Sequence, residues 1–165
     1  MIALIKPALP WFHPATLVAT WFGSGLLSKA PGTWGSLAAL PFAWAIAWIG
    51  GPWLLAAAVV AVFIVGLWAS HVYAKALGAA DPGCVVVDEV AGQWLALLPV
   101  ALAGAYYPLA FIAFRFFDIL KPWPVSWLDK RVKGAFGIMA DDIMAGLYGA
   151  AVTFAALRAV ESFTE

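Results

Sequence analysis

Six of the nine acidic residues gather in three short groups along a chain that is otherwise strongly apolar. They are Asp88 and Glu89 before one apolar stretch, Asp118 at the end of the next, and Asp129, Asp141 and Asp142 around the start of the last. A carboxylate at the edge of an apolar bundle is costly unless it is paired or binds a cation. Two adjacent carboxylates also repel each other unless a cation intervenes. Acids with no thiol cluster and few histidines suit a hard cation such as Mg²⁺.

Cationic side chains accompany the middle group. Arg115, Asp118 and Lys121 recur every three residues and therefore share one face of a helix. This spacing fits an internal ladder of ion pairs at a membrane edge. It equally fits an acid that binds a metal between two cations that bind an anion. The prolines at 122 and 124 end this helix.

A segment rich in Gly, Ser and Thr, residues 23–36, leads into the first long apolar stretch. Free backbone N–H groups at a helix start, with Lys29, Thr33 and Ser36, could cradle a phosphate. A simple capped turn explains the same residues equally well, and the order of a P-loop is missing. Together with the acids and cations, the segment predicts metal-assisted chemistry on a phosphorylated lipid.

The composition predicts an integral membrane protein. Of the 165 residues, 65% are hydrophobic and 11% are charged, against about 25% charged in soluble domains. The net charge is zero, which implies no nucleic-acid surface. The lone Cys84 excludes an internal disulfide, and the first residues do not resemble a cleaved signal peptide.

Four apolar regions, 34–49, 52–70, 90–120 and 143–160, predict an all-α, polytopic membrane bundle of about four to five membrane helices. We expect a tight turn at 50–52 and interpret 90–120 as a hairpin that turns at 104–108, in preference to one tilted helix. We expect one domain over 1–165, in which 1–22 form an interfacial segment.

Two hairpins place the acidic groups and most of the basic residues on one face, while the turns at 50–52 and 104–108 carry no charge. The positive-inside rule makes that face cytoplasmic. Arg158 and Glu161 would then lie near the far side, in mild conflict with the rule.

Four blocks resemble the phosphatidylglycerophosphatase A family: APGTWGS at 30–36, VDEVAG at 87–92, RFFDILKPWP at 115–124 and GIMADDIMAG at 137–146. The resemblance runs in order from about Gly23 to Gly149. It implies an all-helical, Mg²⁺-dependent enzyme of the bacterial inner membrane. Such an enzyme would remove the terminal phosphate of phosphatidylglycerophosphate and release phosphatidylglycerol and inorganic phosphate.

On this basis the candidate residues receive roles. We expect metal ligands at Glu89, Asp118, Asp141 and Asp142, with Asp88 as a further candidate. These five acids and Lys121 form the candidate catalytic set, and phosphate binding is assigned to Lys29, Thr33, Ser36, Arg115 and Lys121. Metal-activated water is the preferred nucleophile, and an aspartyl-phosphate intermediate is the second choice.

A small ion-coupled transporter subunit is the alternative from another class of protein. Its acids would lie at the midplane of the membrane on broken or opposed helices. Here the acids gather at helix ends, which favours surface chemistry on a membrane lipid. The sequence does not give the oligomeric state.

Overall fold

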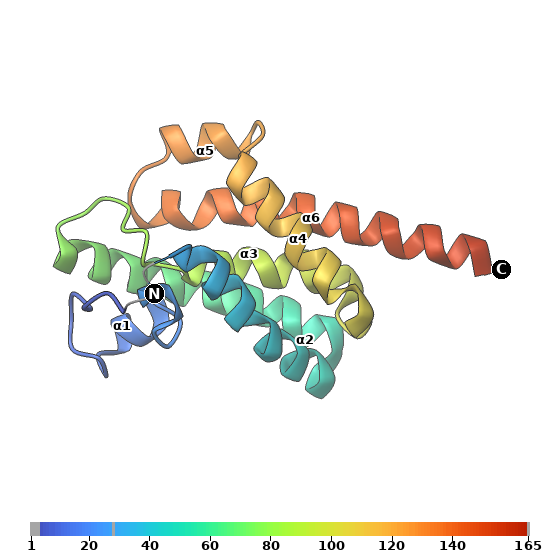
Figure 1. Cartoon of the computed structure of the whole chain (residues 1–165), viewed down its shortest axis with the longest axis horizontal. Coiled ribbons are helices and arrows are strands. Elements are labelled where there is room, and N and C mark those ends of the chain that lie inside the picture. Colours follow the sequence, from blue (N-terminus) through green and yellow to red (C-terminus); the bar gives the residue numbers. More distant parts are fainter. Residues whose placement is uncertain (1–3, 28, 165) are drawn as a thin grey trace.

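The computed structural model describes residues 4–27 and 29–164, and their regular structure is helical apart from an isolated bridge between Leu4 and Leu27. The α-helices are α1 Pro14–Ala19, α2 Pro31–Leu77, α3 Val87–Leu97, α4 Tyr107–Leu120, α5 Val125–Arg131 and α6 Gly134–Thr164 (Figure 1). Short 3₁₀ turns cover Ser24–Leu26, Leu98–Val100 and Gly104–Tyr106. The predicted all-α class is confirmed.

Helix α2 is a hairpin of two arms, residues 31–49 and 52–77. Gly50 and Gly51 leave helical geometry, and Gly51 has a φ of 68°, which favours glycine over residues with a side chain. Pro52 follows, where a missing backbone N–H costs least. In Figure 1 the second arm runs back beside the first. The predicted turn at 50–52 is confirmed.

Region 90–120 is also a hairpin, as the sequence predicts. The chain leaves α3 at Leu97, turns through residues 98–106, and returns as α4 from Tyr107. At 1.5 Å per residue, α3 and α4 are about 17 and 21 Å long, shorter than the roughly 30 Å hydrocarbon core of a bilayer. Four to five full-length spans are therefore not confirmed.

By length and composition, two described helices could cross a membrane: α2, over Pro31–Leu77, and α6, over Gly134–Phe163. Only 33% of the most apolar window of α2 and 22% of that of α6 is buried, whereas a core helix of a soluble protein is mostly buried. Large apolar side chains cover the outside of these helices, among them Trp48, Trp53, Ile64 and Phe154.

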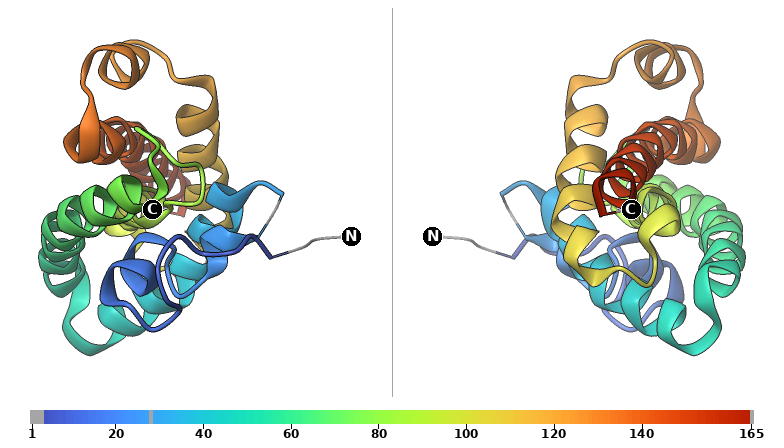
Figure 2. Two further views of the ribbon diagram at one scale, coloured as in Figure 1. Left: turned by 90° about the vertical axis from the view of Figure 1, so that its left-hand side faces the viewer. Right: turned by 90° about the vertical axis from the view of Figure 1, so that its right-hand side faces the viewer.

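The central helix is α3, which lies between α2 and α6 (Figures 1 and 2). Val90, Trp94 and Leu97 on α3 belong to the main apolar cluster. The indole Nε1 of Trp94 donates a hydrogen bond to the Ala39 carbonyl at 2.9 Å, and the Thr153 hydroxyl of α6 donates to the Ala96 carbonyl at 3.0 Å. These bonds tie both neighbours to α3 and satisfy polar groups inside the bundle.

Two glycines let α3 and α6 touch backbone to backbone. A Cβ on Gly146 would lie 2.5 Å from the Gly92 carbonyl oxygen, and a Cβ on Gly92 would lie 2.5 Å from the Asp142 carbonyl oxygen. Gly149 continues the contact, because its Cβ would lie 2.9 Å from Cβ of Ala96. Small residues therefore bring this end of α6 into close contact with α3.

The N-terminal segment packs against the loop before α3. The Val86 N–H donates to the Ala19 carbonyl at 2.8 Å, and Thr16 and Ala19 are buried. Phe12 and Phe22 are exposed, as an interfacial segment requires, and that role of 1–22 stays a prediction. Residues 1–3, Ser28 and Glu165 lie outside the described residues.

Candidate active site

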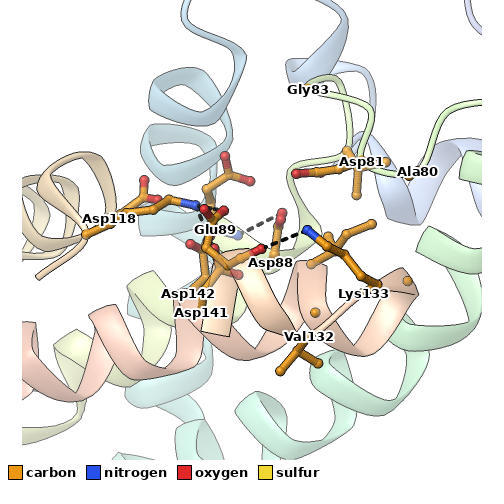
Figure 3. A pocket seen from close by; sticks show the side chains of 16 residues that line it. Ala80, Asp81, Gly83, Asp88, Glu89, Asp118, Val132, Lys133, Asp141 and Asp142 are labelled. Carbon is orange, nitrogen blue, oxygen red and sulfur yellow. Dashed lines mark hydrogen bonds and ion pairs between the residues drawn. The ribbon is translucent and has the colours of Figure 1, made fainter. Parts of the chain in front are cut away.

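A cavity of about 220 Å³ lies where α3 begins, α4 ends and α6 begins (Figure 3). In Figure 1 these helix ends lie away from the turn between the two arms of α2. The walls of the cavity come from the loop before α3, the first turn of α3, the end of α4, the segment from α5 into α6, and the early turns of α6. The charged residues that line it are Asp81, Asp88, Glu89, Asp118, Lys121, Asp129, Lys133, Asp141 and Asp142. All three acidic groups of the sequence therefore meet in one place, and this expectation is confirmed.

Asp88, Glu89 and Asp142 form the tightest group. One carboxylate oxygen from each lies within 4.8 Å of the other two, a spacing that a single cation could bridge. The Glu89 N–H donates to Oδ1 of Asp88 at 3.1 Å, while the buried Oε2 of Glu89 has no hydrogen-bond partner among the described residues. In Figure 3 these carboxylates converge with that of Asp141 in the middle of the cavity, and Asp118 lies to one side.

Lys121 joins the end of α4 to α5 and α6. Its Nζ lies 2.6 Å from Oδ1 of Asp129 and 2.7 Å from Oδ2 of Asp141. The residue ends α4 in the left-handed region, at a φ of 46°, which is uncommon for a side chain of this kind and typical of functional positions. Burial lowers the pKa of Lys121, but its bonds to Asp129 and Asp141 outweigh burial and raise the pKa above its ordinary range.

Arg115 lies behind the acids and does not line the cavity. Its Nη1 forms an ion pair with Oδ2 of Asp118 at 2.5 Å and lies 3.9 Å from Oε1 of Glu89. Gly32, in the first turn of α2, also abuts this pair, and a Cβ there would collide with the Glu89 carboxylate. The structure thus places Arg115 where it orients two carboxylates, not where it meets a phosphate in the cavity.

The predicted phosphate cradle at the start of α2 is not assembled in the cavity. Ser36 is fully buried, its hydroxyl donates to the Gly32 carbonyl at 2.9 Å, and it does not line the cavity, so its contact with a phosphate stays a prediction. Lys29 and Thr33 are also absent from the cavity lining. The reason is the packing of α2. Gly35 lies so close to Val86 that a Cβ on Gly35 would collide with the Val86 side chain, so this face of α2 packs against the loop before α3.

Three charged residues that line the cavity receive no role from the sequence: Asp81, Asp129 and Lys133. Asp129 reads as a loop residue in a mixed charged run, yet its carboxylate binds Lys121. Asp81 starts an Asp-Pro-Gly turn only seven residues before Asp88, and this proximity is the one signal in the sequence that could have placed it near the site.

More acidic than basic side chains line the cavity. Among the described residues, seven carboxylates and two ammonium groups line it. One of these ammonium groups, that of Lys121, already pairs with the carboxylates of Asp129 and Asp141. The carboxylates of Asp88, Glu89 and Asp142 approach one another within 4.8 Å and therefore repel each other when charged. A divalent cation relieves this repulsion, and oxygen donors of this kind fit Mg²⁺.

The sequence model of one protein family, phosphatidylglycerophosphatase A, matches residues 17–157, a range that includes every residue of the cavity lining. Phosphatidylglycerophosphatase A of Escherichia coli is 40% identical over 151 residues, which cover 90% of this chain and 87% of that protein. The protein of the same name from Haemophilus influenzae is 37% identical over 144 residues, 87% of this chain and 88% of the relative.

A third relative differs in its name. A Bacteroides thetaiotaomicron protein, provisionally named phosphatidylinositol-3-phosphatase, is 40% identical over 152 residues, which cover 84% of this chain and 90% of that protein. No solved structure matches the chain.

Proposed function

Because the chain belongs to the phosphatidylglycerophosphatase A family, we propose that it removes the terminal phosphate of phosphatidylglycerophosphate and yields phosphatidylglycerol and inorganic phosphate. The observation that carries the proposal is the convergence of five predicted acids in one cavity, inside the region that the family shares. The transporter alternative has no comparable support, since its acids would lie at the midplane of the bundle.

Mg²⁺ is the cation that we propose for this cavity, with Asp88, Glu89 and Asp142 as its nearest ligands. Asp118 and Asp141 line the same space and could complete the set directly or through water. The bound ion would offset the charge of the phosphate and activate water. Arg115 holds Asp118 and Glu89 in place, as the neighbours of metal ligands commonly do.

Lys121 supplies positive charge to the phosphoryl group as it is transferred. Its raised pKa keeps the ammonium protonated, so that it acts through charge and is a poor proton donor to the leaving oxygen. Asp129 and Asp141 hold Nζ at the edge of the acid group, which limits the positions that the side chain can take. Attack by water remains our preferred route, and an aspartyl-phosphate intermediate is the second.

Removing divalent cations should abolish phosphate release. In detergent micelles that contain phosphatidylglycerophosphate, we expect EDTA to stop the reaction and excess Mg²⁺ to restore it, because the cavity is too negative to bind the substrate alone. Phosphatidylinositol 3-phosphate is tested in parallel, because the name of the third relative suggests this headgroup as the substrate in place of phosphatidylglycerophosphate. No phosphate release from phosphatidylglycerophosphate with Mg²⁺ present would disprove the proposed function.

The protein would cross the bacterial inner membrane several times, with the cavity facing the cytoplasm. Both arms of α2, the α3–α4 hairpin and α6 would form the membrane part, and eight of the nine Lys and Arg residues would lie toward the cavity end. The turns at 50–51 and 104–106 lie together at the opposite end (Figure 1), which supports this arrangement.

Cysteine labelling tests this orientation. In a protein with Cys84→Ala, we expect Ala105→Cys in the far turn to react with an impermeant maleimide from outside the cell. Lys130→Cys on α5 should react only in inverted vesicles. Both positions are well placed for labelling, since Ala105 and Lys130 are exposed and Cys84 is buried. Labelling of both cysteines from the same side would contradict the arrangement.

A further inference from the structure

Lys133 is a cation of the cavity whose charge is not neutralised by a neighbouring acid. It immediately precedes the first residue of α6, lines the cavity and is exposed. Its Nζ donates one long hydrogen bond, 3.4 Å, to the backbone carbonyl of Asp129, and within residues 4–27 and 29–164 it has no ion pair. An ammonium group on a rim rich in carboxylates, without a direct partner, is available to an anionic ligand.

The second lysine of the cavity differs in this respect. Lys121 is in contact with two carboxylates, those of Asp129 and Asp141, at 2.6 and 2.7 Å. In Figure 3, Lys133 and Asp81 lie on the side of the acid group away from Asp118. Asp81 would repel a phosphate, so positive charge on this side comes from Lys133.

The proposed substrate carries two phosphates with different fates. The terminal monoester is cleaved, whereas the phosphodiester that joins the headgroup to the lipid stays intact. A glycerol unit of three carbons separates them, so a monoester at Asp88, Glu89 and Asp142 leaves the diester elsewhere in or beside the same cavity. A cationic group that lies off the acid cluster is well suited to bind this diester.

We propose that Lys133 determines headgroup specificity by binding the phosphodiester of the substrate, an inference that rests on the proposed function. A lipid with a phosphodiester then gains an interaction that a simple phosphomonoester lacks. Since one charged hydrogen bond is involved, the loss of Lys133 should weaken the binding of such lipids about tenfold. The chemistry at the acid cluster should not change.

The experiment compares two lipids as competitive inhibitors of phosphatidylglycerophosphate hydrolysis by the full-length protein in micelles with Mg²⁺. Phosphatidylglycerol has the diester without the monoester, and phosphatidic acid has the monoester without the diester. For Lys133→Gln we expect the inhibition constant of phosphatidylglycerol and the KM of the substrate to rise about tenfold. The inhibition constant of phosphatidic acid and kcat should stay within about twofold of the parent.

Lys130→Gln is the matched control, because this exposed lysine removes the same charge three residues away and does not line the cavity. It should leave both inhibition constants unchanged, and Lys133→Arg should restore most of the affinity for phosphatidylglycerol. Equal weakening of both inhibitors by Lys133→Gln, an equal effect of Lys130→Gln, or no inhibition of the parent by phosphatidylglycerol would each overturn the assignment. A parent protein that releases no phosphate at all refutes the proposed function instead.

Discussion

Changing Asp142 to asparagine will lower the turnover of phosphatidylglycerophosphate about a thousandfold, a loss of several kcal/mol of transition-state stabilisation, while the helices stay folded. Asp142 is 4% exposed and belongs to the tight group with Asp88 and Glu89. An amide has nearly the same shape as a carboxylate, so the packing against α3 is kept. It lacks the negative charge by which a carboxylate strengthens the binding of a divalent cation.

The same substitution should abolish the stabilisation of the protein by Mg²⁺. At about a hundred times its Kd, a ligand that binds only the folded state adds about 2.7 kcal/mol to the free energy of unfolding. The parent should therefore melt at a higher temperature in Mg²⁺ than in EDTA, and Asp142→Asn should show no difference. In EDTA the variant should be at least as stable as the parent, because it removes one charge from a group of buried acids.

Asp81→Asn is the matched control for Asp142→Asn, since it removes an acid from the exposed rim of the same cavity. We expect it to cost less than about fivefold in turnover, because an exposed charge is largely screened by solvent. Phosphate release and thermal unfolding, each with and without Mg²⁺, provide the two measurements. Parent-like turnover in Asp142→Asn would remove this residue from the metal site.

Adding one methyl group where α3 crosses α6 will reduce kcat/KM about a hundredfold, although no polar atom changes. The substitution is Gly146→Ala, whose Cβ would lie 2.5 Å from the Gly92 carbonyl oxygen. That neighbour is backbone, so the helices must move apart. Glu89 lies about one turn before Gly92 and Asp142 one turn before Gly146. Separation at the crossing therefore widens the acid group next to it.

Gly146→Ala has two opposing effects on the free energy of unfolding. Alanine favours a helix over glycine by about 1 kcal/mol, whereas overpacking a tight contact costs about 1–3 kcal/mol. We expect a small net loss of stability and a weaker apparent affinity for Mg²⁺. Gly104→Ala is the control, because a Cβ on Gly104 would have no neighbouring atom within 4 Å. This variant should behave as the parent. Unchanged activity and Mg²⁺ affinity in Gly146→Ala would show that the crossing does not set the spacing of the acids.

The two hairpins could be predicted because their signals are local. Gly50, Gly51 and Pro52 interrupt an apolar run, and the turn at 104–108 does the same, so the direction of each helix follows from the sequence. The meeting of the acids at one end then follows from the alternation of helix directions. The lengths of the helices were less predictable, because α3 already ends at Leu97, before the turn that the sequence indicates at 104–108.

The rotation of α2 about its axis could not be predicted. A helix that is apolar on every side has no polar stripe to mark the face that packs inward. Thr33 and Ser36 therefore gave no sign of whether they would face the cavity, and Ser36 is buried against its own helix. Lys121 posed a different problem, since its left-handed backbone directs the chain toward Asp129, and no local pattern specifies that conformation.

The α3–α6 contact also has a consequence for biosynthesis. Asp88 and Glu89 precede Asp141 and Asp142 by about fifty positions, and α6 is the last described helix to emerge from the ribosome. The cavity can therefore close only after α6 has inserted beside α3. Until then, Arg115 can pair with Glu89 and Asp118, but Asp88 and Glu89 lack the neighbouring Asp142 carboxylate. The acid cluster is thus assembled at the same late step of synthesis at which the bundle is completed.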